Sequence, residues 1–360
     1  MKGLAEKLLF SAPILKMQTL IVKADSKENI KLAANWLRRG RLVALPTETV
    51  YGLGADATNE KAVAKIFSAK GRPACDPVIV HIASIEMLLL VVSEIPEVAQ
   101  QLIASFWPGP LTLVLPKADR IPDIVTANLP TVAVRMPQNE IILALIKEAG
   151  VPVAAPSANS FGYPSPTCAE HVMEDLGGKI DLILDAGQTL VGIESTVVDI
   201  TSFLPVILRP GAVSRESLED ILGEVSVWSG GDSEALKSPG QMNQHYAPRA
   251  KVLLFGGKCR QRVIETMRER IEELRKGSKI GVMVPEEELC HFNDENIVVI
   301  SVGSFTTLEE VAKRLFGVMR ALDKREVDYI FAIAPPKKGI GLAIFDRLFK
   351  ASGSKLIEVD

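Results

Sequence analysis

The sequence predicts an α/β protein of two parts, in which a twisted mixed sheet covered by helices precedes a smaller, doubly wound parallel sheet. Three observations lead to this prediction. Apolar runs of strand length alternate with segments of helical period from residue 19 to about residue 223. The same alternation resumes at residue 251, after a stretch rich in Gly, Ser and Pro. A chain of 360 residues is also too long for one ordinary core.

The strands of the first part are predicted from apolar runs between turn residues or helix-period segments. They are residues 20–23, 42–45, 78–82, 111–115, 132–135, 151–154, 182–184, 196–199 and 206–208. The first helix has the clearest boundary signals. Ser26 is suited to be its N-cap, apolar residues at positions 30, 33, 34 and 37 share one face, and Gly40 follows as a stop.

The second part repeats strands and crossover helices, which is typical of a parallel sheet of Rossmann-like shape. The predicted strands are residues 251–255, 280–284, 297–302 and 329–334, and the predicted helices are residues 261–276, 308–322 and 340–351. Gly256 and Gly257 follow the first of these strands without the Gly-x-Gly-x-x-Gly spacing, so no bound dinucleotide is predicted.

Between the two parts, Gly, Ser and Pro dominate without an apolar period, which indicates an interdomain linker. We therefore expect domains over residues 17–225 and 250–360, joined by a linker over residues 226–249. Residues 238–248 contain aromatic and polar side chains, including His245 and Tyr246, and so are expected to be more than a spacer.

Composition excludes several classes of protein. Lys plus Arg number 41 against 44 for Asp plus Glu, so the formal charge of −3 gives no global attraction to nucleic acid. The four cysteines and four histidines lack the spacing of a disulfide framework or a zinc site. No apolar run is long enough for a membrane span. The apolar run in the first sixteen residues is too short for a signal peptide, so we expect these residues to be either a dispensable extension or a misassigned start, with Met17 as the alternative. A cytoplasmic protein is expected.

Two candidate clusters follow the strand at residues 42–45. Thr49 lies in the loop after it, where hydroxyl groups can hold a carboxylate or hydroxyl of a small substrate, or satisfy the turn itself. Lys70 and Arg72 end the helix that begins near Asn59. Two cations there complement the helix dipole, but Gly71 between them lets the backbone approach a ligand as a phosphate clamp requires.

The remaining candidates lie at other strand ends. Ala155 and Ser157 follow the strand at residues 151–154, where small side chains permit close approach of a flat ring or a phosphate, or simply form a tight turn. Arg135 ends another strand and can grip a carboxylate bidentately. Arg209 ends the strand after the one that Ser195 opens, so both could face one anionic ligand.

Motifs that are missing narrow the chemistry. The sequence has neither the Gly-x-x-x-x-Gly-Lys-Ser/Thr motif of a P-loop nor the Gly-x-Ser-x-Gly motif of a hydrolase. Without these motifs, the sequence favours a reaction in which the protein only positions the substrates and neutralises charge. Nucleotidyl transfer onto an already anionic nucleophile is such a reaction.

Together these segments resemble the YrdC-like threonylcarbamoyl-AMP synthases, in the long form that carries a C-terminal domain. The matching segments arrive in the order of that family and are residues 46–54, 70–82, 108–112, 134–137, 155–159, 195–199, 208–211 and 245–248. The resemblance implies that L-threonine, bicarbonate and ATP give threonylcarbamoyl-adenylate and pyrophosphate. A partner transferase would then modify tRNA, and weak tRNA binding by this chain is compatible with that.

The resemblance also assigns residues by motif position. Threonine would be held by Thr49, His81, Arg135, Ala155 and Thr196. ATP would be surrounded by Lys70, Arg72, Thr131, Ser157, Ser165, Ser195, Arg209 and Tyr246, while the linker folds over the site. Mg²⁺ is expected to bridge ATP phosphates, without a predicted protein ligand. The family usually has Asn where this chain has Asp76, which is left open as a nucleotide or metal contact.

Two other functions stay open at this point. An RNA-binding module would grip tRNA without chemistry, although the average basic content and the lack of stacking aromatics argue against it. A carbamoyl transferase that uses carbamoyl-phosphate is the other alternative, since related domains carry out that reaction.

Overall fold

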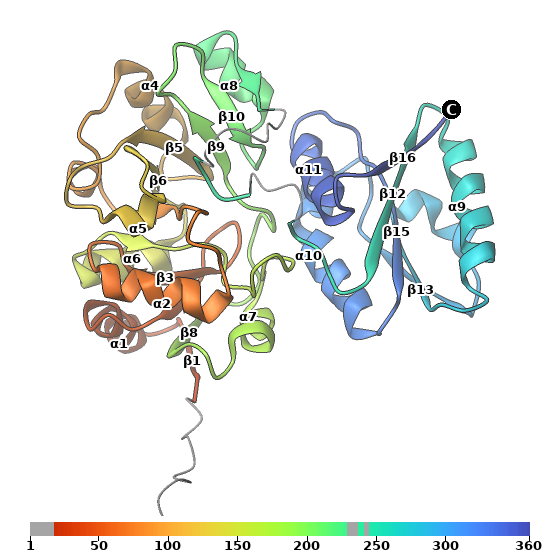
Figure 1. Cartoon of the computed structure of the whole chain (residues 1–360), viewed down its shortest axis with the longest axis horizontal. Helices are drawn as coiled ribbons and strands as arrows, with labels where there is room; N and C mark the ends of the chain where they lie inside the picture. Colours follow the sequence, from red (N-terminus) through yellow and green to blue (C-terminus); the bar gives the residue numbers. More distant parts are fainter. Residues whose placement is uncertain (1–17, 229–236, 241–244) are drawn as a thin grey trace, which may run out of the picture.

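The computed structural model describes residues 18–228, 237–240 and 245–360, which form two α/β units (Figure 1). The predicted N-terminal extension lies outside the described residues, as do positions 229–236 and 241–244 of the predicted linker. In the part of the chain that the structure describes, no helix is both long enough and apolar enough to cross a membrane.

The first unit is built on a mixed sheet with the strand order β1-β8-β2-β3-β7-β4-β6-β5-β9-β10-β11. The strands are β1 (Leu20–Lys23), β2 (Val43–Leu45), β3 (Gly52–Asp56), β4 (Val80–His81), β5 (Leu111–Pro116), β6 (Thr131–Arg135), β7 (Val153–Ala154), β8 (Leu182–Asp185), β9 (Thr196–Asp199), β10 (Val206–Arg209) and β11 (Ser226–Val227). Parallel and antiparallel pairs are mixed along it, which confirms the predicted class.

Helices cover this sheet on both faces (Figure 1). They are α1 (Lys27–Arg38), α2 (Glu60–Lys70), α3 (Ile85–Leu88), α4 (Glu97–Phe106), α5 (Asp123–Thr126), α6 (Glu140–Ala149), α7 (Ala169–Leu176) and α8 (Arg215–Leu222). Ser26 caps α1 by accepting a hydrogen bond from the Asn29 amide, as predicted. Asn59 caps α2 in the same way, and Gly71 ends it in the left-handed conformation at φ 67°.

The strand β3 was not among the strands predicted from the sequence. Gly52–Asp56 pairs antiparallel with β2 on one side and with β7 on the other, and every residue of it is buried. Two glycines among five residues give it a low strand propensity, so burial in the middle of the sheet decides its conformation. The predicted strands at residues 78–82 and 151–154 are real but shorter, as β4 and β7.

The second unit is a parallel sheet with the order β14-β13-β15-β12-β16, as the crossover pattern predicted. Its elements are β12 (Lys251–Gly257), α9 (Arg260–Leu274), β13 (Ile280–Val284), the 3₁₀ helix η1 (Glu286–Phe292), β14 (Ile297–Ser301), α10 (Leu308–Lys324), β15 (Tyr329–Ile333), α11 (Gly341–Ala351) and β16 (Leu356–Val359). The edge strand β16 was not predicted. Helix α9 covers one face and helices α10 and α11 cover the other (Figure 1), so the sheet is doubly wound.

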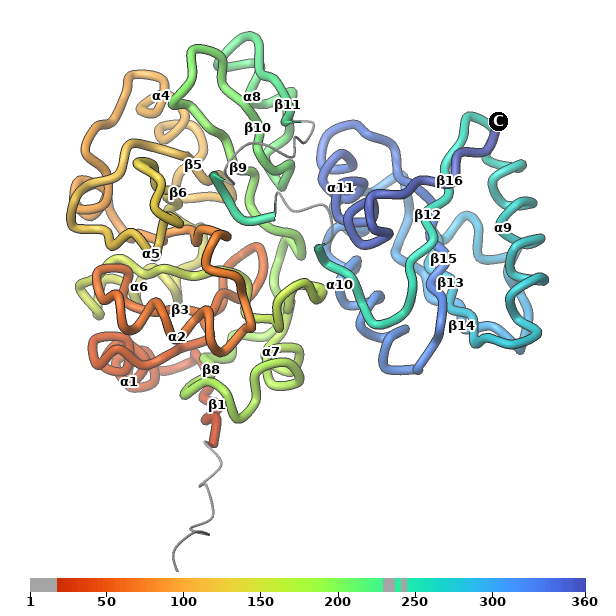
Figure 2. Tube along the Cα trace, viewed as in Figure 1, coloured from red at the N-terminus to blue at the C-terminus, as the bar shows by residue number. Residues whose placement is uncertain are grey.

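The two units meet through the face that carries α10 and α11, with α9 on the far side (Figure 2). Val50 and Ile193 of the first unit belong to the same buried apolar cluster as residues of α10 and α11. Arg320 of α10 donates hydrogen bonds of 2.8 and 3.1 Å to the carboxylate of Asp175 in α7. Apolar and ionic contacts therefore hold the units in one arrangement.

Candidate functional site

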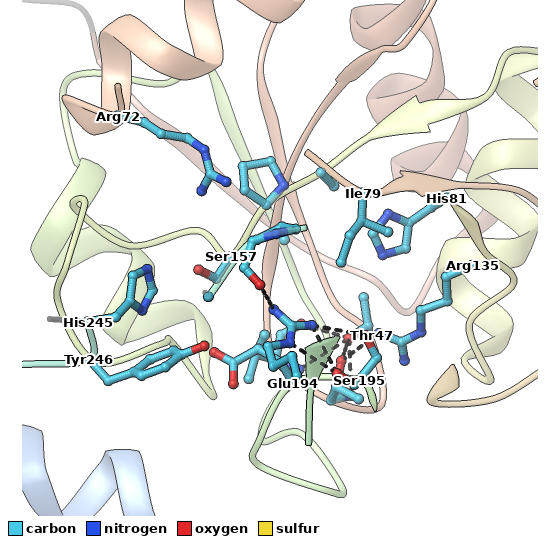
Figure 3. Close-up of a pocket in the computed structure, with 18 residues that line it drawn as sticks. Thr47, Arg72, Ile79, His81, Arg135, Ser157, Glu194, Ser195, His245 and Tyr246 are labelled. Atoms are coloured by element: carbon cyan, nitrogen blue, oxygen red, sulfur yellow. Dashed lines mark hydrogen bonds between the residues drawn. The ribbon is translucent and has the colours of Figure 1, made fainter. Parts of the chain in front are cut away.

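A pocket opens where the ends of several strands of the first unit meet the segment that leads to the second unit. About 500 Å³ of space lies between its atoms, a figure that includes open solvent at its mouth. The predicted site residues that line it are Thr49, Arg72, His81, Arg135, Ala155, Ser157, Ser195, Arg209 and Tyr246. Figure 3 shows His81 and Arg135 on one side, with Arg72, His245 and Tyr246 on the other.

Arg135 organises one side of the pocket, called here the Arg135 side. Its Nη1 donates a 2.9 Å hydrogen bond to Thr49 Oγ1, and its Nε donates to the Gly109 carbonyl at 3.1 Å. Nη2 lies 2.6 Å from Glu48 Oε1, as an ion pair without the alignment of a hydrogen bond. A guanidinium fixed on two edges can present its remaining N–H groups to a carboxylate.

His81 lies beside this guanidinium, at the end of β4. It pairs in register with Arg135 of β6, and its imidazole is buried. Its Nδ1 has no hydrogen-bond partner among the described residues. Burial and the neighbouring Arg135 lower the pKa of His81 to about 3, so the ring is neutral near pH 7. A neutral imidazole can accept a hydrogen bond from a hydroxyl or ammonium group of a small ligand.

Arg209 organises the other side, called here the Tyr246 side. It donates hydrogen bonds of 3.1 and 3.0 Å to the Ser195 carbonyl and one of 3.1 Å to Ser195 Oγ. Gly240 brings the second half of the predicted linker against it. A Cβ at Gly240 would lie 2.8 Å from the Tyr246 hydroxyl and 2.9 Å from Cδ of Arg209, and its φ of +85° also favours glycine.

Tyr246 is buried, but its hydroxyl has no hydrogen-bond partner within the described ranges. Its ring meets the ring of His245 edge-on at 4.1 Å and stacks on Phe316 of the second unit at 5.6 Å. Burial raises the pKa of Tyr246, so the phenol stays protonated and able to donate. An unpartnered buried donor at a pocket wall is suited to a polar ligand.

Lys70 lies behind the lining on this side and contacts backbone carbonyls. Its ammonium donates to the carbonyl of Ser157 at 2.6 Å and to that of Asn159 at 2.5 Å. Burial and the neighbouring Arg72 lower the pKa of Lys70 well below its ordinary value. An anionic ligand placed next to it would favour the charged form, because opposite charge stabilises an ammonium.

Arg72 and Asp76 form a buried ion pair beside the pocket, with Nη2 and Oδ2 2.9 Å apart. The Arg72 guanidinium also donates to the carbonyls of Asp76 and Pro77. Burial raises the pKa of Asp76, against the opposing effect of Arg72. Asp76 does not line the pocket, so it would affect a ligand mainly through Arg72, whose positive charge it partly neutralises.

If ATP binds here, as the resemblance implies, replacing Asp76 with Asn is expected to strengthen its binding, because the variant removes a negative charge that competes for Arg72. We expect the KM for ATP to fall by about threefold to tenfold, or about 0.7–1.4 kcal/mol. Steady-state pyrophosphate release checks this. Asp119→Asn removes the same charge at an exposed position and is the control. An unchanged or higher KM in Asp76→Asn would contradict the expectation.

Three predicted residues have their side chains engaged elsewhere or lie apart. Thr196 Oγ1 donates to the Val213 carbonyl at 2.6 Å and accepts from its amide at 3.0 Å. Ser165 Oγ donates to Glu194 Oε1. Thr131 begins β6, at the opposite end from Arg135. The structure does not place these three in the pocket lining, and their ligand roles stay predictions.

Two buried carboxylates were missed by the sequence reasoning. Glu48 pairs with Arg135 and accepts the Gln138 amide at 2.9 Å. Glu194 lines the pocket and accepts a 2.7 Å hydrogen bond from Arg347 of α11. Each lies next to a predicted residue, Glu48 before Thr49 and Glu194 before Ser195, and an acidic residue at such a position was the available signal.

The described residues contain no group of three or more His, Cys, Asp and Glu side chains that could hold a metal ion. The four cysteines are free. The hydrogen-bond donors of the pocket are cationic side chains and hydroxyl groups from several chain segments. Such donors are suited to an anionic ligand that lies beside a small polar ligand.

Family models recognise both units of the chain. A model described as "Telomere recombination" (Sua5, YciO and YrdC) matches residues 35–211. A second, described as the C-terminal domain of threonylcarbamoyl-AMP synthase, matches residues 213–353. The fold and pocket thus belong to a class of two-part YrdC-like proteins that carry a Sua5 C-terminal domain.

Relatives match nearly the whole chain. A threonylcarbamoyl-AMP synthase of Pyrococcus abyssi is 47% identical, covering 92% of this chain and 96% of the relative, and one of Bacillus subtilis is 46% identical, covering 91% and 94%. The crystal structure of P. abyssi Sua5 complexed with L-threonine superposes with a TM-score of 0.89 at 46% identity, covering 95% of this chain and 99% of the other. This chain belongs to the threonylcarbamoyl-AMP synthase family.

Proposed function

We propose that this protein is an L-threonylcarbamoyladenylate synthase, a nucleotidyltransferase that converts L-threonine, bicarbonate and ATP to threonylcarbamoyl-AMP and pyrophosphate. The product would pass to a transferase that modifies tRNA. The observation that carries the proposal is one pocket with Arg135 and His81 on one side and Arg72, Arg209 and Tyr246 on the other (Figure 3). Its relatives of the same name, and the threonine complex of one of them, support it.

On the Arg135 side, the guanidinium would bind the carboxylate of threonine while Thr49 and neutral His81 bind its polar groups. The amine of threonine would then lie toward the middle of the pocket. In its neutral form it would add to the carbon of bicarbonate with loss of one water, which gives a carbamate anion. Because a carbamate is already anionic, it needs no strong general base to act as a nucleophile.

On the Tyr246 side, ATP would lie with its triphosphate near Arg209, Arg72 and Lys70. A carbamate oxygen would form a bond to the α-phosphorus as the bond to pyrophosphate breaks. The three cations would neutralise charge on the phosphate oxygens and on the leaving pyrophosphate. Mg²⁺ would come with the triphosphate, whose oxygens hold it, since the described residues supply no carboxylate cluster for it.

We further propose that residues 17–225 are the catalytic domain and that residues 250–360 are a separate C-terminal domain. Residues 226–249, which link the two, would fold over the active site. His245 and Tyr246 already line the pocket, and burial on that side would keep the mixed anhydride from water. Because water hydrolyses this product, exclusion of water from the pocket would increase the amount of product that is released intact.

The proposal predicts that pyrophosphate release requires ATP, threonine and bicarbonate together, and that the adenylate forms in equal amount. Chromatography with mass detection identifies the adenylate directly. Carbamoyl-phosphate in place of threonine and bicarbonate is the control for the carbamoyl-transferase alternative. A salt-sensitive complex with tRNA but no turnover in any mixture would contradict the proposal and favour an RNA-binding module.

A further inference from the structure

Arg347 of α11 belongs to the second unit, yet its guanidinium lies under the pocket of the first. The side chain is fully buried. Nε donates a 2.7 Å hydrogen bond to Glu194 Oε2, and Nη2 donates a 3.0 Å hydrogen bond to the Pro210 carbonyl. The guanidinium carbon also lies 4.9 Å from the centre of the Tyr246 ring, as a cation–π contact.

These three contacts reach three separate segments that carry proposed ATP residues. Glu194 precedes Ser195, and Pro210 follows Arg209. The third segment is the end of the predicted linker, where Arg347 contacts Tyr246 itself, which is one of the proposed ATP residues. One side chain therefore links the segments that carry Ser195, Arg209 and Tyr246. Among the described residues it has no hydrogen bond or ion pair with the Arg135 side.

The contact to Glu194 is a charged one. Burial opposes ionisation of this carboxyl, but Arg347 and Arg209 outweigh it and lower the pKa of Glu194 to about 2. Ser165 Oγ donates to the other carboxylate oxygen. A buried carboxylate whose two oxygens both accept hydrogen bonds has a fixed orientation. Only a planar guanidinium can bind such a carboxylate, donate to a backbone carbonyl and lie against an aromatic ring at the same time.

We propose that Arg347 is a positioning residue for the nucleotide, through which the second unit sets the geometry of Ser195, Arg209 and Tyr246. The identity of the ligand as ATP rests on the proposed function. The second unit then contributes to nucleotide affinity without supplying a group that touches the reacting atoms. Threonine affinity depends on the opposite side of the pocket and is independent of Arg347.

Arg320 provides a matched control, because it is also a buried arginine of the second unit that binds a carboxylate of the first. It pairs with Asp175 and donates to the Pro164 carbonyl at 2.6 Å, and it is absent from the pocket lining. Both Arg347→Gln and Arg320→Gln weaken the contact between units. Only Arg347→Gln removes the contacts to Glu194, to the Pro210 carbonyl and to the Tyr246 ring.

The test measures ATP and threonine binding separately by titration calorimetry on the full chain, with thermal unfolding to confirm that each variant is folded. We expect Arg347→Gln to raise the Kd for ATP by about tenfold, or about 1.4 kcal/mol, and to leave the Kd for threonine within about twofold. Arg320→Gln is expected to leave both constants within about twofold. KM for ATP should follow the same order.

Equal losses of ATP affinity in the two variants would overturn the inference, because the role would then be domain contact alone. Unchanged ATP affinity in Arg347→Gln would also overturn it. If that variant does not fold, Arg347→Lys and Glu194→Gln are read in the same way, and both must weaken ATP binding selectively. Wild-type protein that binds ATP but forms no adenylate would refute the proposed function, whereas the binding comparison would still decide the role of Arg347.

Discussion

Lys70→Ala is expected to lower turnover by about 10²- to 10³-fold, the usual cost of losing one preorganised charge-stabilising donor. The ammonium is held by the carbonyls of Ser157 and Asn159, so it is already positioned when the ligand arrives. Charge on the triphosphate would raise its proton affinity from the lowered value in the free protein. Steady-state and single-turnover assays of pyrophosphate release measure the loss.

Lys61→Ala is the control for this prediction, because Lys61 lies on the same helix α2 but is exposed. It removes the same charge and leaves the pocket intact, so turnover should match the wild type. Normal turnover in Lys70→Ala would refute the proposed role of Lys70. Loss of turnover in both variants would assign the effect to the helix rather than to the ammonium.

Arg135→Lys is expected to raise the KM for threonine by about 10²-fold, or about 2.7 kcal/mol. A lysine keeps a positive charge beside Glu48 but cannot also hold Thr49 and the Gly109 carbonyl while it binds a carboxylate. The ATP side should be affected much less. Threonine titrations by calorimetry, and kinetics with each substrate varied in turn, separate the two effects.

Arg120→Lys makes the same exchange at an exposed position and should change neither constant. Thermal unfolding shows whether Arg135→Lys retains the fold with Glu48 still paired. Wild-type threonine affinity in a folded Arg135→Lys protein would refute the assignment of the Arg135 side to threonine. Equal losses for ATP and threonine would instead indicate a general distortion of the pocket.

Local signals were sufficient to predict most of the fold. The Ser26 cap, the helix start near Asn59 and the alternation of strands and helices depend on neighbours in the sequence, and the structure confirms them. The strand β3 depends instead on its place between β2 and β7, which no local pattern contains. Long-range pairing is thus the part of the fold that the sequence alone left unspecified.

The site was predicted to a similar degree. Strand-end signals found several residues of the pocket lining, such as Arg135 and Arg209, because strand ends are where ligands collect. The partners that orient them could not be found in this way. Glu194 and Arg347 are 153 positions apart and meet only through the contact of the two units, so no spacing in the chain indicates the pair.

Because Tyr246 stacks on Phe316, its ring belongs both to the pocket and to the hydrophobic core of the second unit. It forms a wall of the pocket, and it is also part of the hydrophobic core built on α10 and α11. Any movement that swings this ring out to admit or release a ligand must therefore uncover apolar surface of the second unit. Exposing that core to water is unfavourable, so the position in which Tyr246 packs on Phe316 is the more stable one.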